Sequence, residues 1–169
     1  MSKSLIIYFS RAGNNYSNEG IKFLEKGNTE VIAEYIQEFT GADMFKVEPL
    51  NEYPEDYMEC TEVAKEELKN DERPKLKECL EGIDEYDVVY LGFPNWWSTL
   101  PMPLWTQLEK LDFSGKLLKP FVTHEGSGMG KSAKDIKKLC KGAKIAKELS
   151  IQGSFVSDSK DKVRIWVED

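Results

Sequence analysis

The sequence is poor in the residues that build disulfide frameworks and metal sites. Its 169 residues include three cysteines, Cys60, Cys79 and Cys140, and a single histidine, His124. The cysteines are widely spaced and none belongs to a CxxC pair, so neither a disulfide framework nor a Cys/His zinc site is expected. Scattered free cysteines fit a reducing compartment, and we predict a cytoplasmic protein.

Long apolar runs and an excess of positive charge are also missing. No apolar segment approaches the roughly 20 residues that span a bilayer, and the apolar run at 5–9 is too short for a signal peptide. The formal net charge is −7 and the sequence pI is about 5.0. Because phosphate backbones recruit basic surfaces, a nucleic-acid partner is not expected, and neither is a membrane. The length and the ordinary composition indicate one domain over residues 1–169.

What the sequence does contain is a regular alternation of strand and helix signals. Short apolar segments predict strands at 5–9, 44–47, 87–93, 120–123 and 148–152, the last of them a half-exposed edge strand. Helical spacing predicts a helix ending at Gly41, one stopping before Pro74, one opened by Pro101, a fourth near Ile136 and a short one in the tail from Ser157. This alternation favours an α/β fold with a parallel sheet, whose ligands bind at the carboxyl ends of the strands.

Two separated stretches look like halves of one phosphate-binding loop. The first, Tyr8–Asn15, follows a strand, and the second, Lys26–Ile36, opens a helix with Asn28 as the expected N-cap. Hydroxyls and free N–H groups at a helix start favour an anion, although ordinary helix capping explains the same residues. Arg11 either pairs with that anion or points outward. Neither GxxxxGK[ST] nor GxGxxG opens a helix, so a single phosphate group is predicted.

Two further loops follow the third and fourth predicted strands. The first reads Pro94-Asn95-Trp96-Trp97, and the two indoles offer a stacking platform for a flat ligand, or else one is core and the other caps a helix. The second, Thr123–Gly130, has three glycines that allow close backbone approach to a ligand, or simply a flexible turn. In it, His124 is either a proton donor or a structural residue. A phosphate site, an aromatic platform and a glycine loop at one sheet edge suit flavin mononucleotide (FMN).

On these loops the chain resembles the flavodoxins, in particular flavodoxin-like proteins with P-N-W-W and T-H-x-G-S-G loops. The resemblance implies a doubly wound five-stranded parallel sheet in the order 2-1-3-4-5, with helices on both faces, bound FMN and electron transfer. Flavodoxins usually carry a contiguous S-x-T-G-N-T loop. Here Ser10 supplies its start and Asn28-Thr29 its end, so residues 11–26 contain an excursion that we expect to pass over the cofactor's edge.

The resemblance also implies a set of cofactor-binding residues. Ser10, Asn28 and Thr29 are expected to hold the phosphate, and one of the paired tryptophans to lie against the isoalloxazine. Backbone groups of Asn95 and of residues 125–128 are expected to hydrogen-bond the ring edge. The full set is Ser10, Arg11, Ala12, Asn28, Thr29, Pro94, Asn95, Trp96, Trp97, His124, Glu125, Gly126, Ser127 and Gly128. Where related chains have Gly after the paired tryptophans, this chain has Ser98.

Three functions remain open at this point. An electron carrier needs an exposed ring edge and a redox partner protein. An NAD(P)H:quinone or nitro-compound reductase needs space for substrates and a proton donor, for which His124 is the candidate. A flavin-free protein-binding module is the third. The carrier is favoured because the chain is small and lacks a nicotinamide fingerprint, and a monomer or weak dimer is expected. Acids for a receiver domain and Cys-x5-Arg for a phosphatase are absent from the corresponding loops.

Overall fold

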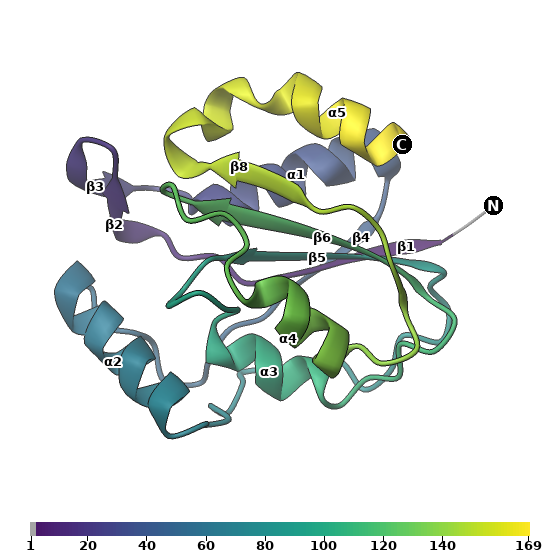
Figure 1. Ribbon diagram of the computed structural model, residues 1–169, viewed down its shortest axis with the longest axis horizontal. Coiled ribbons are helices and arrows are strands. Elements are labelled where there is room, and N and C mark those ends of the chain that lie inside the picture. The colour runs from purple at the N-terminus through teal and green to yellow at the C-terminus, as the bar shows by residue number, and fades with distance from the viewer. Residues whose placement is uncertain (1–2) are drawn as a thin grey trace.

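A parallel sheet runs through the middle of the protein, with helices on both of its faces (Figure 1). The computed structural model describes residues 3–169. In spatial order the strands are β4 (Asp43–Lys46), β1 (Ser4–Tyr8), β5 (Val88–Pro94), β6 (Leu117–His124) and β7 (Lys144–Ile145), while β8 (Leu149–Gln152) pairs with the second half of β6. All of these pairings are parallel. The predicted order 2-1-3-4-5 is therefore confirmed.

The edge of the sheet consists of two pieces, β7 and β8, of which β8 is the edge strand predicted at 148–152. β7 pairs with Leu117 and Leu118 at the start of β6, and β8 pairs with Phe121–His124 at its end. Between the two pieces, the Lys147 carbonyl accepts a hydrogen bond from the Trp166 indole at 2.9 Å. This carbonyl is thereby drawn toward the C-terminal helix, which interrupts the edge strand at that point.

The helices cover the sheet in two layers with separate cores. On one face, α1 (Asn28–Thr40) and α5 (Lys160–Glu168) pack over Ile6, Tyr90 and Phe121. On the other, α3 (Met102–Leu108) and α4 (Ser132–Leu139) pack over Leu5, Leu91 and Val122. The α2 helix (Tyr57–Lys69) lies beyond the carboxyl ends of the strands in Figure 1. A 3₁₀ helix, η1 (Gly153–Asp158), precedes α5, so the tail helix begins later than the predicted Ser157.

The start of α1 differs from the prediction that Asn28 is its N-cap. Gly27 is the N-cap, without a side-chain cap bond of its own, and Asn28 is the first helical residue. Ser10 takes over the capping role, since its Oγ accepts a hydrogen bond from the Glu30 N–H at 3.0 Å. The predicted C-cap of this helix, Gly41, is confirmed. The cap of α1 is thus supplied from the end of β1, a contact that local sequence does not reveal.

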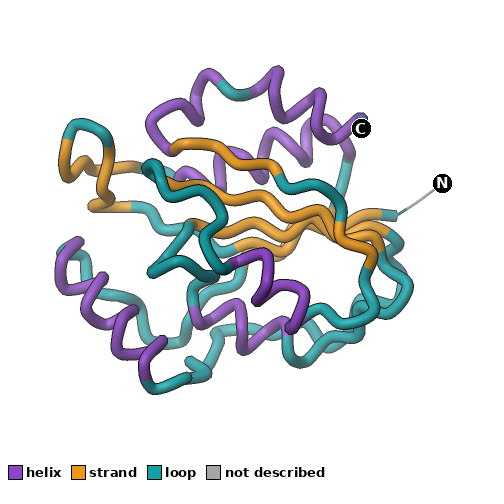
Figure 2. The backbone as a smooth tube through the Cα atoms, viewed as in Figure 1, coloured by secondary structure: helices purple, strands orange, loops and turns teal. Residues whose placement is uncertain are grey.

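The excursion between the two loop halves is an antiparallel hairpin, which the sequence analysis did not predict. Its strands are β2 (Gly13–Ser17) and β3 (Gly20–Leu24), joined by a two-residue turn. Figure 2 shows this hairpin projecting beyond the carboxyl ends of the main strands. The first and last residues of the hairpin, Gly13 and Leu24, are register partners, so the chain leaves and re-enters the fold at nearly the same place.

Candidate functional site

Three loops meet at the carboxyl edge of the sheet, together with the start of α1. A cavity of about 230 Å³ lies between them. Its wall includes Asn28 from α1, Asn95 and Trp96 from the loop after β5, and His124 and Glu125 from the end of β6. The hairpin and the start of α2 close the remaining side with Asn15, Tyr16 and Tyr57. The structure therefore brings the tryptophan loop, the glycine loop and Asn28 of the phosphate loop to one cavity, whereas Ser10 lines a neighbouring hollow.

The two halves of the expected phosphate loop are in direct contact. A Cβ added to Gly27 would lie 2.2 Å from the Ser10 Oγ and 2.6 Å from the Arg11 carbonyl oxygen, which no real side chain tolerates. Only glycine permits this approach, so the excursion does close on itself as expected. The first amides of a helix have no intrahelical acceptor, and α1 therefore directs N–H groups of Asn28 and Thr29 toward this junction.

Three of the predicted cofactor-binding residues have side chains that make other contacts or line another hollow. The Arg11 guanidinium donates to the backbone carbonyls of Asn14 at 3.3 Å and Glu55 at 3.0 Å, so it fastens the hairpin to the segment before α2. The Thr29 hydroxyl is buried and hydrogen-bonded to the Thr123 hydroxyl at 2.8 Å. Ala12 is exposed and lines a separate hollow beside β4. Ser10 and Asn28 stand at the junction of the two loop halves.

The paired tryptophans have different environments. Trp96 packs edge-on against Phe9 and Tyr53, with ring centroids 5.0 Å apart in both pairs. Trp97 is 47% exposed, and its indole N–H donates to the Thr61 carbonyl of α2 at 3.0 Å. Trp96 is thus partly buried against the core, and Trp97 lies against α2 without capping it, because Thr61 is inside that helix.

Trp97 and Ser98 form the two central positions of a tight turn. Trp96 and Thr99 exchange both backbone hydrogen bonds across it. Both central residues have positive φ, 53° for Trp97 and 71° for Ser98, the sign pattern of a type I′ turn. Such turns favour Asn-Gly, and a non-glycine residue in this region costs on the order of 1–3 kcal/mol. The turn therefore stores strain beside the cavity.

The glycine loop after β6 is tied to the tryptophan loop. The Asn95 side-chain amide donates to the Ser127 Oγ at 3.1 Å and to the Gly128 carbonyl at 2.7 Å. Gly126, Gly128 and Gly130 all have positive φ, the conformation for which the glycines are suited. Two of the backbone N–H groups that were expected to hydrogen-bond the ring edge already have acceptors within the protein. The Asn95 N–H donates to the Thr123 carbonyl, and the Gly126 N–H donates to the His124 ring.

His124 and Glu125 end β6 at the cavity wall. The His124 Nδ1 accepts the Gly126 N–H at 2.8 Å, which fixes the turn and places a neutral ring's proton on Nε2. Burial lowers the pKa of His124 below its ordinary value, with Glu125 opposing and Lys162 reinforcing the shift. The Glu125 carboxylate accepts a hydrogen bond from the Ser154 hydroxyl at 3.1 Å. At neutral pH the histidine is therefore uncharged and the carboxylate is held toward η1.

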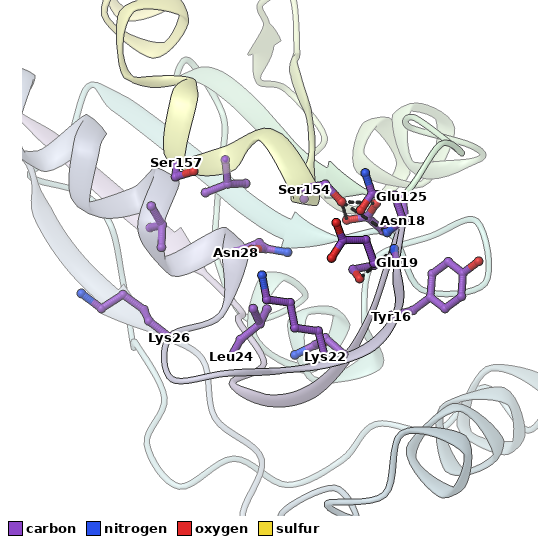
Figure 3. A pocket seen from close by; sticks show the side chains of 15 residues that line it. Tyr16, Asn18, Glu19, Lys22, Leu24, Lys26, Asn28, Glu125, Ser154 and Ser157 are labelled. Atoms are coloured by element: carbon purple, nitrogen blue, oxygen red, sulfur yellow. Dashed lines mark hydrogen bonds between the residues drawn. The ribbon is translucent and has the colours of Figure 1, made fainter.

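A second cavity, of about 370 Å³, lies between the hairpin, the start of α1 and η1 (Figure 3). Lys22 of β3 extends into it toward Asn28, whereas Lys26 pairs with Glu34 of α1 at 2.6 Å. Ser154 and Glu125 meet on the opposite wall (Figure 3). A positive side chain thus stands in a cavity that also touches the first residue of α1.

A match to a protein-family model shows which family the chain belongs to. A family model described as flavodoxin matches residues 21–169. The chain belongs to the flavodoxin family. No curated protein matches it. Among solved structures, this flavodoxin is similar to two proteins assigned as flavoproteins, from Bacteroides uniformis ATCC 8492 and Bacteroides eggerthii DSM 20697. They are 26% and 28% identical to this chain, and each has a TM-score of 0.76. Both matches cover 99% of this chain, and they cover 99% and 97% of the respective Bacteroides chains.

A more distant likeness is to a flavoprotein in complex with FMN from Lactobacillus acidophilus NCFM. It is 20% identical, with a TM-score of 0.63, and the match covers 94% of this chain and 98% of that one. At this identity the likeness supports the fold. Within residues 3–169 of this flavodoxin, no helix is long and apolar enough to cross a membrane. The same residues hold no group of three metal-ligating side chains.

Sequence reasoning missed the residues that the hairpin and α2 add to the flavodoxin site. Tyr16 stacks on Tyr57 with ring centroids 6.3 Å apart, which joins the hairpin to α2. The Asn18 N–H donates to the Ser154 Oγ at 3.3 Å, which joins the hairpin to η1. The available signal was the tyrosine in the polar first half of the excursion, residues 13–19. It did not reveal a partner because the second ring belongs to another element.

Proposed function

We propose that this protein binds FMN at the carboxyl edge of its sheet and transfers electrons between redox partner proteins. The observation that carries the proposal is the contact between Ser10 and Gly27, which assembles one anion-binding helix start from two distant segments. The FMN complex of the structurally similar Lactobacillus protein supports the choice of flavin. Bound FMN would supply the electron-transfer chemistry, and the protein's residues would hold and orient it.

The residues present fit a phosphorylated flavin. The Ser10 hydroxyl and the Asn28 and Thr29 N–H groups would hold the phosphate at the start of α1, where the helix dipole favours negative charge. Lys22 would add a positive charge from the hairpin. The loops containing Trp96 and Gly126–Gly128 would enclose the ring, and the unused amides of the glycine loop would hydrogen-bond its edge. Arg11 and Ala12 have no part in this assignment.

The test compares FMN with riboflavin, which lacks the phosphate. Quenching of flavin fluorescence gives both dissociation constants, and we expect FMN to bind at least about tenfold more tightly because the phosphate gains charge-assisted hydrogen bonds. Equal affinities would contradict a phosphate site at Ser10 and Asn28. No uptake of either flavin would leave the flavin-free protein-binding module as the better proposal.

A reductase acting on NAD(P)H and a quinone or nitro compound is the second candidate. It is favoured by an apolar cavity beside the tryptophan loop, because a carrier needs no such space. Anaerobic reductive titration of the FMN-loaded protein separates the two. A spectrum at half reduction that differs from the average of the oxidised and reduced spectra supports the carrier. A simple average, together with oxidation of NAD(P)H by quinones, supports the reductase.

A further inference from the structure

A group of lysines covers the outside of α4 and the segment that follows it. Residues 131–147 contain seven lysines and a single acid, Asp135, so they carry a formal charge of +6, whereas the rest of the chain carries −13. None of these residues belongs to the loops assigned to the flavin. All seven lysines are exposed: Lys131, Lys134, Lys137, Lys138, Lys141, Lys144 and Lys147. A strongly basic surface thus stands on an otherwise acidic protein.

Helical spacing gathers four of these lysines on one side of α4. The helix buries Ser132 and Ile136 against the sheet. The exposed side carries lysines three and four residues apart, which together form the α4 lysine face: Lys131, Lys134, Lys137 and Lys138. Like charges at this spacing destabilise a helix, and Lys134 in the first turn also opposes the helix dipole. The stability of α4 therefore does not explain the lysines.

The charge of the α4 lysine face is not used inside the protein. Within residues 3–169, none of its four lysines forms a salt bridge or donates a side-chain hydrogen bond, and the ion pairs involve other cations. The Asp135 carboxylate is hydrogen-bonded to the Thr99 hydroxyl instead. Lys138 has an acid in its neighbourhood, because the pKa of Asp71 is lowered by Arg73 and, to a smaller extent, by Lys138. The face is therefore available to an external anionic partner.

The α4 lysine face is joined to both loops that would enclose the flavin ring. The Lys131 N–H donates to the Ser98 carbonyl of the tryptophan turn at 2.7 Å, and Asp135 holds Thr99 of the same turn. Figure 1 shows α4 following the glycine loop after β6 and running back along the sheet. A partner bound at the start of α4 would therefore lie beside the two loops.

An acidic protein fits this face better than a membrane or a nucleic acid does. Membrane-surface helices insert their apolar side into the bilayer, but Ile136 and Leu139 of α4 pack on the protein core. An extended polyanion would also meet the negative charge of the surrounding chain. A protein can place its acids opposite the lysines alone, and screening confines the interaction to about 8 Å at physiological ionic strength.

We propose that the α4 lysine face is a docking surface for the acidic face of a redox partner protein. Carboxylates of the partner pair with the lysines, and the partner then lies against the outer side of the glycine loop. This inference deepens the proposed function by naming the charge of one partner and the surface that it uses. It rests on that function for the partner's redox role.

The test uses an acidic plant-type [2Fe–2S] ferredoxin as the probe. Fluorescence anisotropy of the dye-labelled ferredoxin gives its dissociation constant from the FMN-loaded protein at ionic strengths of about 0.01 and 0.15 M. We expect binding at the lower ionic strength and weaker binding at the higher, because the Debye length falls from about 30 to about 8 Å. No binding at the lower ionic strength, or an affinity that does not depend on salt, would overturn the proposal.

Three double variants locate the surface. Lys134→Gln/Lys137→Gln should weaken ferredoxin binding by about fivefold or more, because it removes two exposed charges that would face carboxylates. The control Lys160→Gln/Lys162→Gln removes the same charge from α5, on the opposite face of the sheet, and should change the affinity by less than about twofold. Lys134→Arg/Lys137→Arg keeps the charge and should bind ferredoxin as the wild type does.

Two further results would overturn the docking surface. Equal losses of ferredoxin affinity in the α4 and α5 glutamine variants would show attraction without a defined site. Tighter binding of phosphatidylserine vesicles or duplex DNA than of ferredoxin, lost in the α4 glutamine variant, would assign the face to a different polyanion.

Flavin uptake separates this proposal from the proposed function. FMN affinity, measured by fluorescence quenching, should be the same in the wild type and in all three variants. Its loss in the α4 glutamine variant would place the lysines in the flavin site and overturn the inference alone. If the wild type takes up no FMN, the proposed function fails, and the same ferredoxin titrations on the flavin-free protein decide the docking surface.

Discussion

Trp96 and Thr99 hold each other through both of their backbone amides, at N···O distances of 3.0 and 3.1 Å. Between them, Trp97 and Ser98 are forced into the left-handed region. The Lys131 N–H donates to the Ser98 carbonyl at 2.7 Å, and the Thr99 hydroxyl is hydrogen-bonded to Asp135 of α4. The surrounding contacts thus maintain a turn for which its own two central residues are poorly suited.

Ser98→Gly should stabilise the protein by about 0.5–1 kcal/mol. Glycine removes a left-handed strain of about 1–2 kcal/mol, while the extra entropy of the unfolded chain offsets about 0.5–1 kcal/mol. Urea unfolding measures the difference in the free energy of unfolding. Ser157→Gly in η1 is the control and should destabilise, since Ser157 is not among the residues with positive φ. Equal effects of the two substitutions would refute strain at Ser98.

Gly27→Ala should destabilise the protein by about 2 kcal/mol or more and weaken FMN binding. The added Cβ would overlap the Ser10 Oγ and the Arg11 carbonyl, so the two loop halves would have to separate. Gly82→Ala is the control, because a Cβ there meets nothing within 4 Å, and it should change stability by less than about 0.5 kcal/mol. Lower stability with unchanged FMN affinity would show that this junction does not contribute to binding of the phosphate.

Deletion of residues 15–24 should weaken FMN binding without abolishing it. The deletion joins Asn14 to Glu25, and these residues lie beside each other because Asn14 pairs with Phe23 and Gly13 with Leu24. The loop junction can then persist, while the cavity wall at Tyr16 and the charge of Lys22 are lost. Flavin fluorescence titration gives the affinity. Complete loss of binding in a folded variant would show that the hairpin is part of the essential site.

His124 should titrate below 6.5, and its contribution to stability should rise with pH. Its pKa is lowered in the folded protein, so between the folded value and 6.5 the unfolded chain binds the additional proton. The free energy of unfolding therefore increases with pH across that window and levels off above it. Because His124 is the only histidine, its ring signal in proton NMR reports the pKa directly. A value at or above 6.5 would contradict the burial argument.

Glu125→Gln should raise the midpoint potential of the FMN-loaded protein. A carboxylate at the cavity wall disfavours negative charge on a reduced flavin, and its removal is expected to shift the potential by roughly 30 mV, or ~1.4 kcal/mol for a two-electron couple. Spectroelectrochemistry measures the shift. Glu148→Gln is the control. It removes the same charge immediately before the first residue of β8 and should leave the midpoint potential nearly unchanged. An unchanged or lower potential in Glu125→Gln would be the contrary result.

The sequence predicted the elements whose signal is local burial. Leu5, Ile6 and Ile7 form a continuous apolar run because β1 is covered on both faces, and the run in β5 has the same cause. The hairpin was missed because its strands contribute nothing to a core: Tyr16, Ile21 and Phe23 are more than half exposed. It is held by strand pairing and by contacts to α2 and η1, which local periodicity does not encode.

The candidate site was predicted at the level of loops but not of individual contacts. Ser10 and Asn28 were identified from their position at a strand end and a helix start. The capping of α1 by Ser10 and the use of Arg11 to fasten the hairpin depend on partners distant in sequence. The distinction between Trp96 and Trp97 depends on α2. No sequence motif indicates that this helix lies beyond the strand ends.

The broken strand at the edge of the sheet has a consequence for self-association. An exposed strand presents a row of free backbone groups that can recruit a strand from another molecule. Here that row is interrupted after Ile145, resumes only at Leu149, and is flanked by the exposed Lys144 and Lys147. Such an edge offers few consecutive partners and repels its own copies, which is a built-in protection against fibrillar growth.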